Sequence, residues 1–136
     1  MGLGIVACGG GIGGQVEGEE FQTEGWIDED TYRIAAAGVP NQSLTNKIQR
    51  RESAKRAAIL NAQYQVLEKF KGSKIEGASG VSDFASTGTA IAQEVKGMVR
   101  GGSVVKATFD EEDNCEVIYE VFARGLKNKV SAAEWE

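Results

Sequence analysis

A cysteine near the start of the chain lies in a short run whose order of side chains suits covalent lipid attachment. The run Leu3-Gly4-Ile5-Val6-Ala7-Cys8 places an apolar side chain three residues before Cys8 and the small Ala7 directly before it. This order is typical of a lipobox, in which a signal peptidase cuts behind the small residue and the cysteine is acylated. Each buried CH₂ of an acyl chain contributes about 0.8 kcal/mol, and more than one chain is needed for stable anchoring. The sequence therefore predicts lipidation of Cys8. The alternative is an inert free cysteine in a buried apolar strand.

The residues on either side of Cys8 refine this interpretation. Only seven residues precede it and none is Lys or Arg, so residues 1–8 are interpreted as a truncated lipoprotein signal.

Gly9, Gly11 and Gly14 match the G-x-G-x-x-G spacing of dinucleotide-binding proteins, but that motif must open a helix within a βαβ unit. The acidic, glycine-rich residues that follow show no helical apolar pattern, so we expect a solvated tether over residues 9–25.

The composition argues against several classes of function. The chain has 136 residues, which is enough for one domain, and a net charge of −5, which disfavours general binding to nucleic acid. It contains no histidine, so the commonest general base and zinc ligand are missing. No apolar run approaches the roughly 20 residues of a membrane-spanning helix. With no catalytic constellation in view, we expect a protein that is not an enzyme and has no catalytic residue, cofactor or metal.

Two clusters of opposite charge are candidates for assembly. The acidic cluster consists of Asp110, Glu111, Glu112 and Asp113, and the basic cluster of Lys47, Arg50, Arg51, Lys55 and Arg56. The oxygen-rich acidic cluster is compatible with calcium, but the ligand spacing, central glycine and terminal glutamate of an EF-hand are missing, which favours a charged hairpin tip. Opposite patches at separate places on one chain favour head-to-tail contacts, which can close into rings. We therefore hypothesise that the basic cluster faces the acidic cluster of an adjacent subunit.

These clusters lie on elements that the local pattern predicts within a folded body, residues 26–136. Alternation predicts a strand over Thr31–Gly38, and a run free of Gly and Pro predicts a long helix over Leu44–Lys71 with Ser43, Thr45 or Asn46 as its N-cap. Its second half carries apolar side chains at helical spacing, expected to pack on a sheet. They are Ile59, Leu60, Tyr64, Val66, Leu67 and Phe70.

The rest of the body is predicted in four further elements. They are a short strand over Lys74–Ala78, a helix from Ser82 or Thr87 to Val99, a hairpin of Ser103–Asp110 and Cys115–Arg124, and a short tail helix with Ser131 and Glu134 as a capping box. The order strand, long helix, strand, helix, hairpin predicts an α+β fold. We expect a small antiparallel or mixed sheet with one long and one shorter helix packed on it.

The last predicted strand has two faces of different character. Cys115, Val117, Tyr119 and Val121 share one face and are expected in the core, with Cys115 as a buried thiol. The other face carries Ile118 and Phe122 among carboxylates. Two apolar side chains there suggest that a helix or a neighbouring molecule partly covers it, so both are assigned to the assembly interface. Trp26 and Trp135 are candidates for a core cap or an interface anchor.

An ordered set of segments resembles the Lpp-twenty-type bacterial lipoproteins, a family that includes FlgP-like flagellar lipoproteins. The matching segments are Ala37-Gly38-Val39-Pro40, the helical run from Arg51 to Leu67, Phe70-Lys71-Gly72, the run from Val99 to Val105, and the hairpin. The resemblance implies a lipid-anchored protein on the periplasmic face of the outer membrane. Its FlgP-like members imply a homo-oligomeric ring or disk around the flagellar motor, with other motor or envelope proteins as further partners. Cys8 matches the family's acylated cysteine.

Two other classes of function remain as alternatives. A monomeric envelope lipoprotein module would bind a glycan or a peptide through the sheet face that carries Ile118 and Phe122. An enzyme without histidine would need a deep pocket with convergent carboxylates or lysines, for which the sequence shows no sign.

Overall fold

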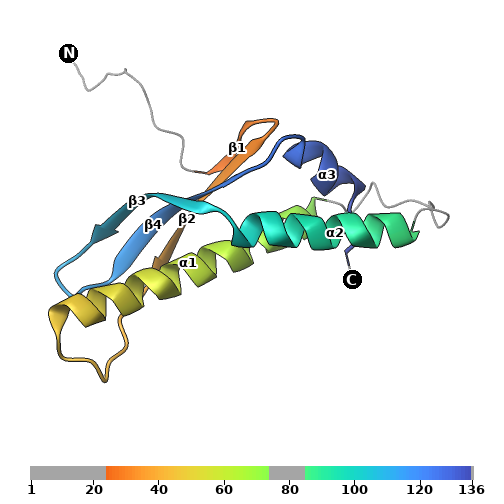
Figure 1. The fold of residues 1–136 in the computed structure, drawn as a ribbon. Coiled ribbons are helices and arrows are strands. Elements are labelled where there is room, and N and C mark those ends of the chain that lie inside the picture. Colours follow the sequence, from red (N-terminus) through yellow and green to blue (C-terminus); the bar gives the residue numbers. More distant parts are fainter. Residues whose placement is uncertain (1–23, 74–84, 136) are drawn as a thin grey trace, which may run out of the picture.

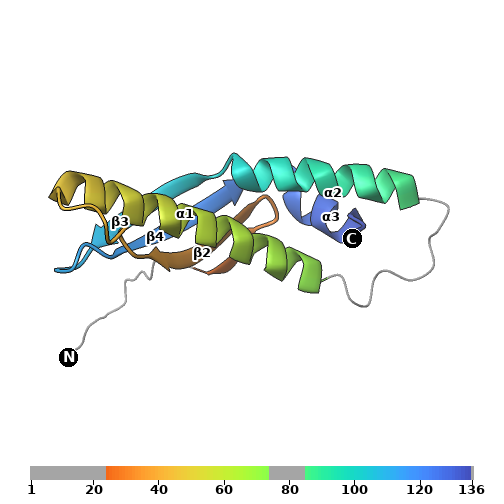
Figure 2. The same ribbon diagram turned by 90° about the horizontal axis from the view of Figure 1, so that it is seen from below.

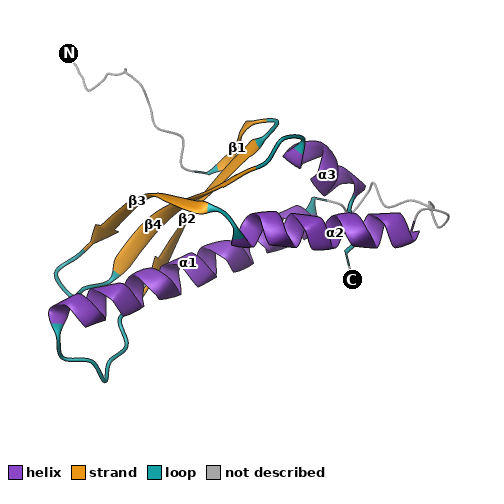
Figure 3. Ribbon diagram, in the orientation of Figure 1, coloured by secondary structure: helices purple, strands orange, loops and turns teal. Residues whose placement is uncertain are grey.

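The computed structural model describes residues 24–73 and 85–135. Within them the elements, in chain order, are β1 (Gly25–Asp28), β2 (Thr31–Gly38), α1 (Lys47–Gly72), α2 (Ala85–Arg100), β3 (Ser103–Phe109), β4 (Cys115–Phe122) and α3 (Leu126–Ala132) (Figure 1; Figure 3 colours them by type). The predictions for Cys8, for most of the tether over residues 9–25 and for a strand over Lys74–Ala78 lie outside the described residues. The end of the predicted tether is described, and there Gly25 already belongs to β1.

The four strands form one antiparallel sheet in the order β1-β2-β4-β3. The central strands β2 and β4 pair along their whole lengths, from Thr31 opposite Phe122 to Gly38 opposite Cys115. β3 forms one edge, and its register with β4 shifts between Val104 and Lys106. The predicted α+β fold is confirmed, and β2 has the limits that alternation predicted.

Strand β1, at the other edge, was not predicted. Its Trp26 lies opposite Tyr32, meets the Tyr32 ring edge-on at 5.0 Å between centroids, and stacks on Phe70 at 5.5 Å. Four residues are too few to show a clear alternation, and the glycines before them suggested a tether. The strand forms because Trp26 completes an aromatic cluster, so this tryptophan is a core cap.

The long helix α1 runs diagonally across one face of the sheet, while α2 extends past the end of the sheet with α3 beside it (Figures 1 and 2). Asn46 caps α1, because its side-chain oxygen accepts a hydrogen bond of 3.1 Å from the backbone N–H of Gln49. Asn46 is one of the three predicted caps. The helix therefore begins at Lys47, three residues later than the predicted start at Leu44.

The side of α1 that faces the sheet matches the predicted apolar stripe only in part: Val66 and Phe70 are buried as predicted. Leu60 and Tyr64 point to solvent, with 60% and 66% of their surface exposed, and Ile59 and Leu67 are only partly buried. The buried side instead repeats every four residues: Ala54, Ala58, Ala62, Val66 and Phe70. A four-residue repeat drifts slowly around a helix of 3.6 residues per turn, so this stripe follows a sheet that α1 crosses obliquely.

Small side chains on this stripe allow an unusually close contact between α1 and β2. A Cβ atom on Gly38 would overlap the backbone carbonyl oxygen of Ala54 and the backbone nitrogen of Ala58. Glycine is therefore required at this position for steric reasons. The last residue of β2 thus also sets the distance between the helix and the sheet.

The predicted capping box at the C-terminal end is wrong. Helix α3 begins at Leu126 and ends at Ala132, so Ser131 lies in its last turn rather than at its start. Leu126 and Val130, four residues apart, are buried and fasten the helix to the core. Gly125 precedes it with a φ of 74°, and its N–H donates to a carboxylate oxygen of Asp30 at 2.8 Å. Burial of two apolar side chains outweighs a local capping pattern.

The outer face of the sheet is open. Val117, Tyr119 and Val121 of β4 are buried under α1 as predicted, whereas Phe122 on the opposite face is 67% exposed and Ile118 is half-buried. Among the described residues no helix lies over this outer face (Figures 1 and 2). Of the two covers expected from the sequence, a helix is not found among the described residues, and cover by a neighbouring molecule stays a prediction.

Candidate assembly surfaces

The tip of the β3–β4 hairpin is organised by a single carboxylate. One carboxylate oxygen of Asp110 accepts hydrogen bonds from the backbone N–H groups of Glu112, at 2.9 Å, and Asn114, at 3.0 Å, while the other accepts from the Asn114 side chain at 3.0 Å. These hydrogen bonds lower the pKa of Asp110, and the one from the Asn114 side chain has the largest effect. Asp110 therefore fixes the conformation of the loop, and both of its carboxylate oxygens already accept hydrogen bonds within the loop.

Asp113, in the same loop, fastens the hairpin to the start of α1. Its carboxylate receives Lys47 Nζ at 2.9 Å, Arg50 Nε at 3.0 Å and Arg51 Nε at 3.1 Å (the Asp113 clamp). The Asp113 backbone has a φ of 69°, and only 6% of the residue is exposed. Hydrogen bonds from Lys47, Arg50 and Arg51 hold its pKa far below the ordinary value.

The Asp113 clamp bears directly on the hypothesis drawn from the charge pattern. Lys47, Arg50 and Arg51 pair with Asp113 within one chain, so these four charges need no adjacent subunit to be paired. The clamp joins residues more than 60 positions apart. A sequence shows opposite charges but does not show whether they meet in one molecule or between two.

Four of the predicted interface charges remain available. Lys55 and Arg56 on α1, and Glu111 and Glu112 on the hairpin tip, form no ion pair within the part of the chain that the structure describes. Arg56 and both glutamates are exposed, and Lys55 is half-buried. These side chains are therefore free to meet an external charge.

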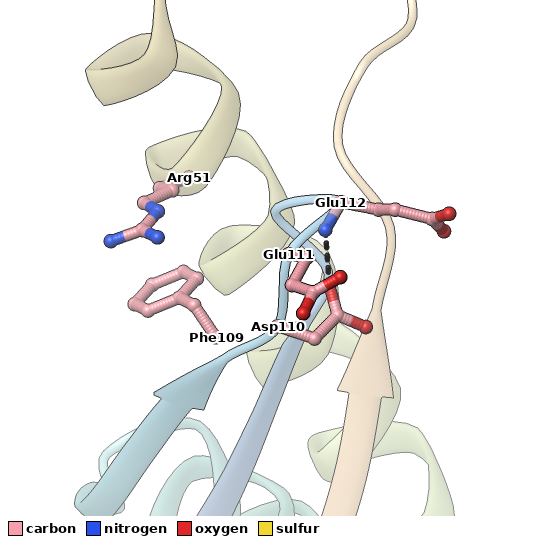
Figure 4. A pocket seen from close by; sticks show the side chains of 5 residues that line it. All are labelled: Arg51, Phe109, Asp110, Glu111 and Glu112. Atoms are coloured by element: carbon pink, nitrogen blue, oxygen red, sulfur yellow. Dashed lines mark hydrogen bonds between the residues drawn. The ribbon is translucent and has the colours of Figure 1, made fainter.

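A hollow opens between the start of α1 and the hairpin tip (Figure 4). It has a volume of about 570 Å³ and is lined by Arg51, Phe109, Asp110, Glu111 and Glu112. The Arg51 guanidinium carbon lies 5.0 Å from the centroid of the Phe109 ring, which fits a cation–π contact. We call this the acidic hollow, because three of its five lining side chains are carboxylates.

A second hollow lies along the flank of α1, one helical turn further on. It has a volume of about 320 Å³ and is lined by Glu52, Lys55, Arg56, Ile59 and Leu60. We call it the basic hollow. Tyr64 follows Leu60 by four residues, so the two exposed apolar side chains are neighbours on the helix surface.

The open sheet face is the third candidate surface. On this face Arg33 Nε pairs with a Glu120 carboxylate oxygen at 3.0 Å, and both side chains are largely shielded from solvent. A depression of only about 70 Å³ lies beside Ile118, lined also by Lys106, Thr108 and Glu116. This depression is too small to enclose a small ligand, because ligand pockets usually measure several hundred Å³.

The remaining candidates from the sequence are structural. Cys115 is a buried free thiol, as predicted, and burial raises its pKa. Trp135 packs against the core and is partly buried, so it acts as a core cap like Trp26. In the described part of the chain, no group of three or more His, Cys, Asp and Glu side chains is placed to hold a metal ion.

Comparisons of this protein with protein families, with curated proteins and with solved structures found no match. Among the described residues, none of the helices combines the length and the apolar character needed to cross a bilayer.

Proposed function

We propose that this protein is a structural lipoprotein of the bacterial envelope that assembles with copies of itself. Acyl chains on Cys8 anchor it to the periplasmic face of the outer membrane, and the folded domain builds a ring or disk around the flagellar motor with other motor or envelope proteins nearby. The domain acts through contacts between surfaces and carries out no catalysis. The lipobox pattern and the resemblance to FlgP-like lipoproteins support the anchor and the location.

One observation carries the self-assembly part of the proposal. Charges of both signs form no ion pair among the described residues, and each pair lies beside apolar side chains. Lys55 and Arg56 line one hollow with Ile59 and the exposed Leu60, and Glu111 and Glu112 line another with Phe109. Apolar side chains rimmed by charges are typical of surfaces that bind another protein.

The full chain, produced in a Gram-negative host behind a complete lipoprotein export signal, tests both parts of the proposal. Intact-protein mass spectrometry should find acyl chains on the wild-type protein and none on the Cys8→Ser variant. Sedimentation in detergent should give a mass well above the 14.5 kDa of one chain. A protein that is unacylated and monomeric at high concentration would contradict the proposal.

A monomeric envelope module that binds a glycan or a peptide is the second candidate. The exposed Phe122 on the open sheet face favours it, because aromatic rings on flat surfaces commonly stack on ligands. This candidate requires a monomer in the sedimentation experiment. It also requires that Phe122→Ser removes ligand binding without changing the molecular mass.

A further inference from the structure

We infer that two copies of this chain dock face to face, with the acidic hollow of each copy placed on the basic hollow of the other. The inference deepens the self-assembly part of the proposed function and rests on it. It replaces the head-to-tail contact expected from the charge pattern with a contact of a different symmetry.

The charges left over after folding are the first argument. Folding uses Asp113 with its three cations, and Asp110 with the backbone of its own loop. Glu111 and Glu112 then remain on the hairpin tip, and Lys55 and Arg56 remain on α1. These four charges form no ion pair among the described residues, and patches of opposite sign suit a contact between two molecules.

The two hollows also match in their remaining side chains. The acidic hollow contains one cation, Arg51, whose Nε binds Asp113 while its terminal nitrogens donate no hydrogen bond within the described residues. The basic hollow contains one carboxylate, Glu52. When the hollows meet, Glu52 of one copy can therefore bind Arg51 of the other, since guanidinium and carboxylate groups form strong charge-assisted hydrogen bonds.

Apolar side chains give the contact a centre. The Phe109 ring lies in the acidic hollow, and Ile59 and Leu60 lie in the basic hollow. Exposed ion pairs alone stabilise little, so burial of these side chains must supply much of the affinity while the charges select the partner and its orientation. This division is the usual one for an interface with an apolar centre and a charged rim.

The position of the hollows decides the symmetry. Arg51 of the acidic hollow and Lys55 of the basic hollow are four residues apart on α1, so the two hollows adjoin on one flank of the molecule. A head-to-tail contact that builds a ring places its two complementary patches on different sides of the subunit. Patches that adjoin on one face are satisfied together by a twofold axis between them. The first contact is thus a closed pair, and a ring needs a second surface, such as the open sheet face.

Charge reversal on the full chain tests the inference. All proteins carry Cys8→Ser, so that no acyl chain contributes to association, and circular dichroism checks their folding. One variant reverses the basic hollow (Lys55→Glu with Arg56→Glu) and another reverses the hairpin tip (Glu111→Lys with Glu112→Lys). Each alone should weaken dimerisation, measured by sedimentation equilibrium at low salt, by about tenfold or more, because like charges then face each other.

Rescue experiments separate a specific contact from a general effect of charge. An equimolar mixture of the two variants should dimerise again, and so should a chain that carries all four changes, because opposite charges then meet once more. Lys69→Glu with Lys71→Glu is the matched control, since it makes the same change in charge at the far end of α1 and should leave dimerisation unchanged. High salt should weaken the wild-type dimer.

The outcomes distinguish failure of the inference from failure of the proposed function. The docking surface is wrong, while self-assembly stands, if the Cys8→Ser parent associates and neither charge reversal weakens its association. The same holds if a reversal weakens association and mixing the two variants does not restore it. Rescue that yields rings instead of dimers would overturn the twofold symmetry. If the wild-type chain stays monomeric at every concentration, both the inference and the self-assembly part of the function fail.

Discussion

The two sides of α1 carry side chains of very different size. Toward the sheet the helix presents Ala54, Ala58 and Ala62, all fully buried, and toward solvent it presents Leu60 and Tyr64, both largely exposed. An ordinary amphipathic helix buries its large apolar side chains. Beside Gly38 the backbone of β2 comes so close that only small residues fit beneath this part of the helix, while the larger Val66 and Phe70 are buried further along the same stripe. Hydrophobicity alone therefore does not identify the inner side of a helix, because the distance to the next backbone decides which side chains fit.

The largest expected effect comes from closing the space between α1 and β2. Gly38→Ala should lower the free energy of unfolding by about 3 kcal/mol or more, because its Cβ would overlap rigid backbone of Ala54 and Ala58. Urea unfolding measures the change. Gly97→Ala in α2 is the matched control: its Cβ would meet no atom within 4 Å, so the same substitution should stabilise by about 0.5–1 kcal/mol. Equal stability of Gly38→Ala and the wild type would show that the close contact is not real.

A smaller effect is expected where charge, and not packing, holds α1 in place. Asp113→Asn keeps a residue that tolerates the positive φ but removes the charge that pairs with Lys47, Arg50 and Arg51. At neutral pH the melting temperature should fall by several degrees. Glu111→Gln removes a charge from the same loop that pairs with nothing in the described chain, and should change little.

The pH dependence of this effect has a definite sign. The folded-state pKa of Asp113 lies below the value of about 3.9 for an unfolded chain, so the unfolded state binds its proton first. The stability that Asp113 contributes is fully present above the unfolded pKa and is lost as the pH falls through the folded pKa. The difference in melting temperature between the wild type and Asp113→Asn should therefore vanish in strong acid. A difference that persisted there would mean that the lost interaction is not ionic.

The smallest effect on stability is expected on the outer side of α1. Leu60→Gln and Tyr64→Gln should each change the free energy of unfolding by no more than about 0.5 kcal/mol, because these side chains are already in water. Val66→Ala, on the inner side of the same helix, should cost about 2 kcal/mol. Leu60→Gln should nevertheless weaken self-association. A large loss of stability in either glutamine variant would mean that the outer side belongs to the core of the monomer.

Prediction from the sequence succeeded where neighbouring residues decide the structure. The alternation of Thr31–Gly38 marked β2 with its observed limits, and Asn46 was among the predicted caps of α1. The hairpin strands were found within one or two residues of their observed ends. It failed for β1, whose four residues are held by the contact of Trp26 with Phe70, far along the chain.

The candidate site divides in the same way. The charged hairpin tip and the basic start of α1 were visible as clusters, because charge is a property of each residue. The sequence does not show which of these charges pair with one another. Asp113 contacts Lys47, Arg50 and Arg51 because β4 pairs with β2 and α1 packs on both strands.

The amino-acid sequence by itself determined the kind and order of most elements of this protein, since capping, alternation and helical spacing act over a few residues. The tertiary structure decided which side of α1 is buried, which charges are neutralised within the chain and which remain at the surface for a partner. These outcomes depend on distances between backbones that are far apart in the sequence, and such distances exist only once the sheet and the helix have packed together.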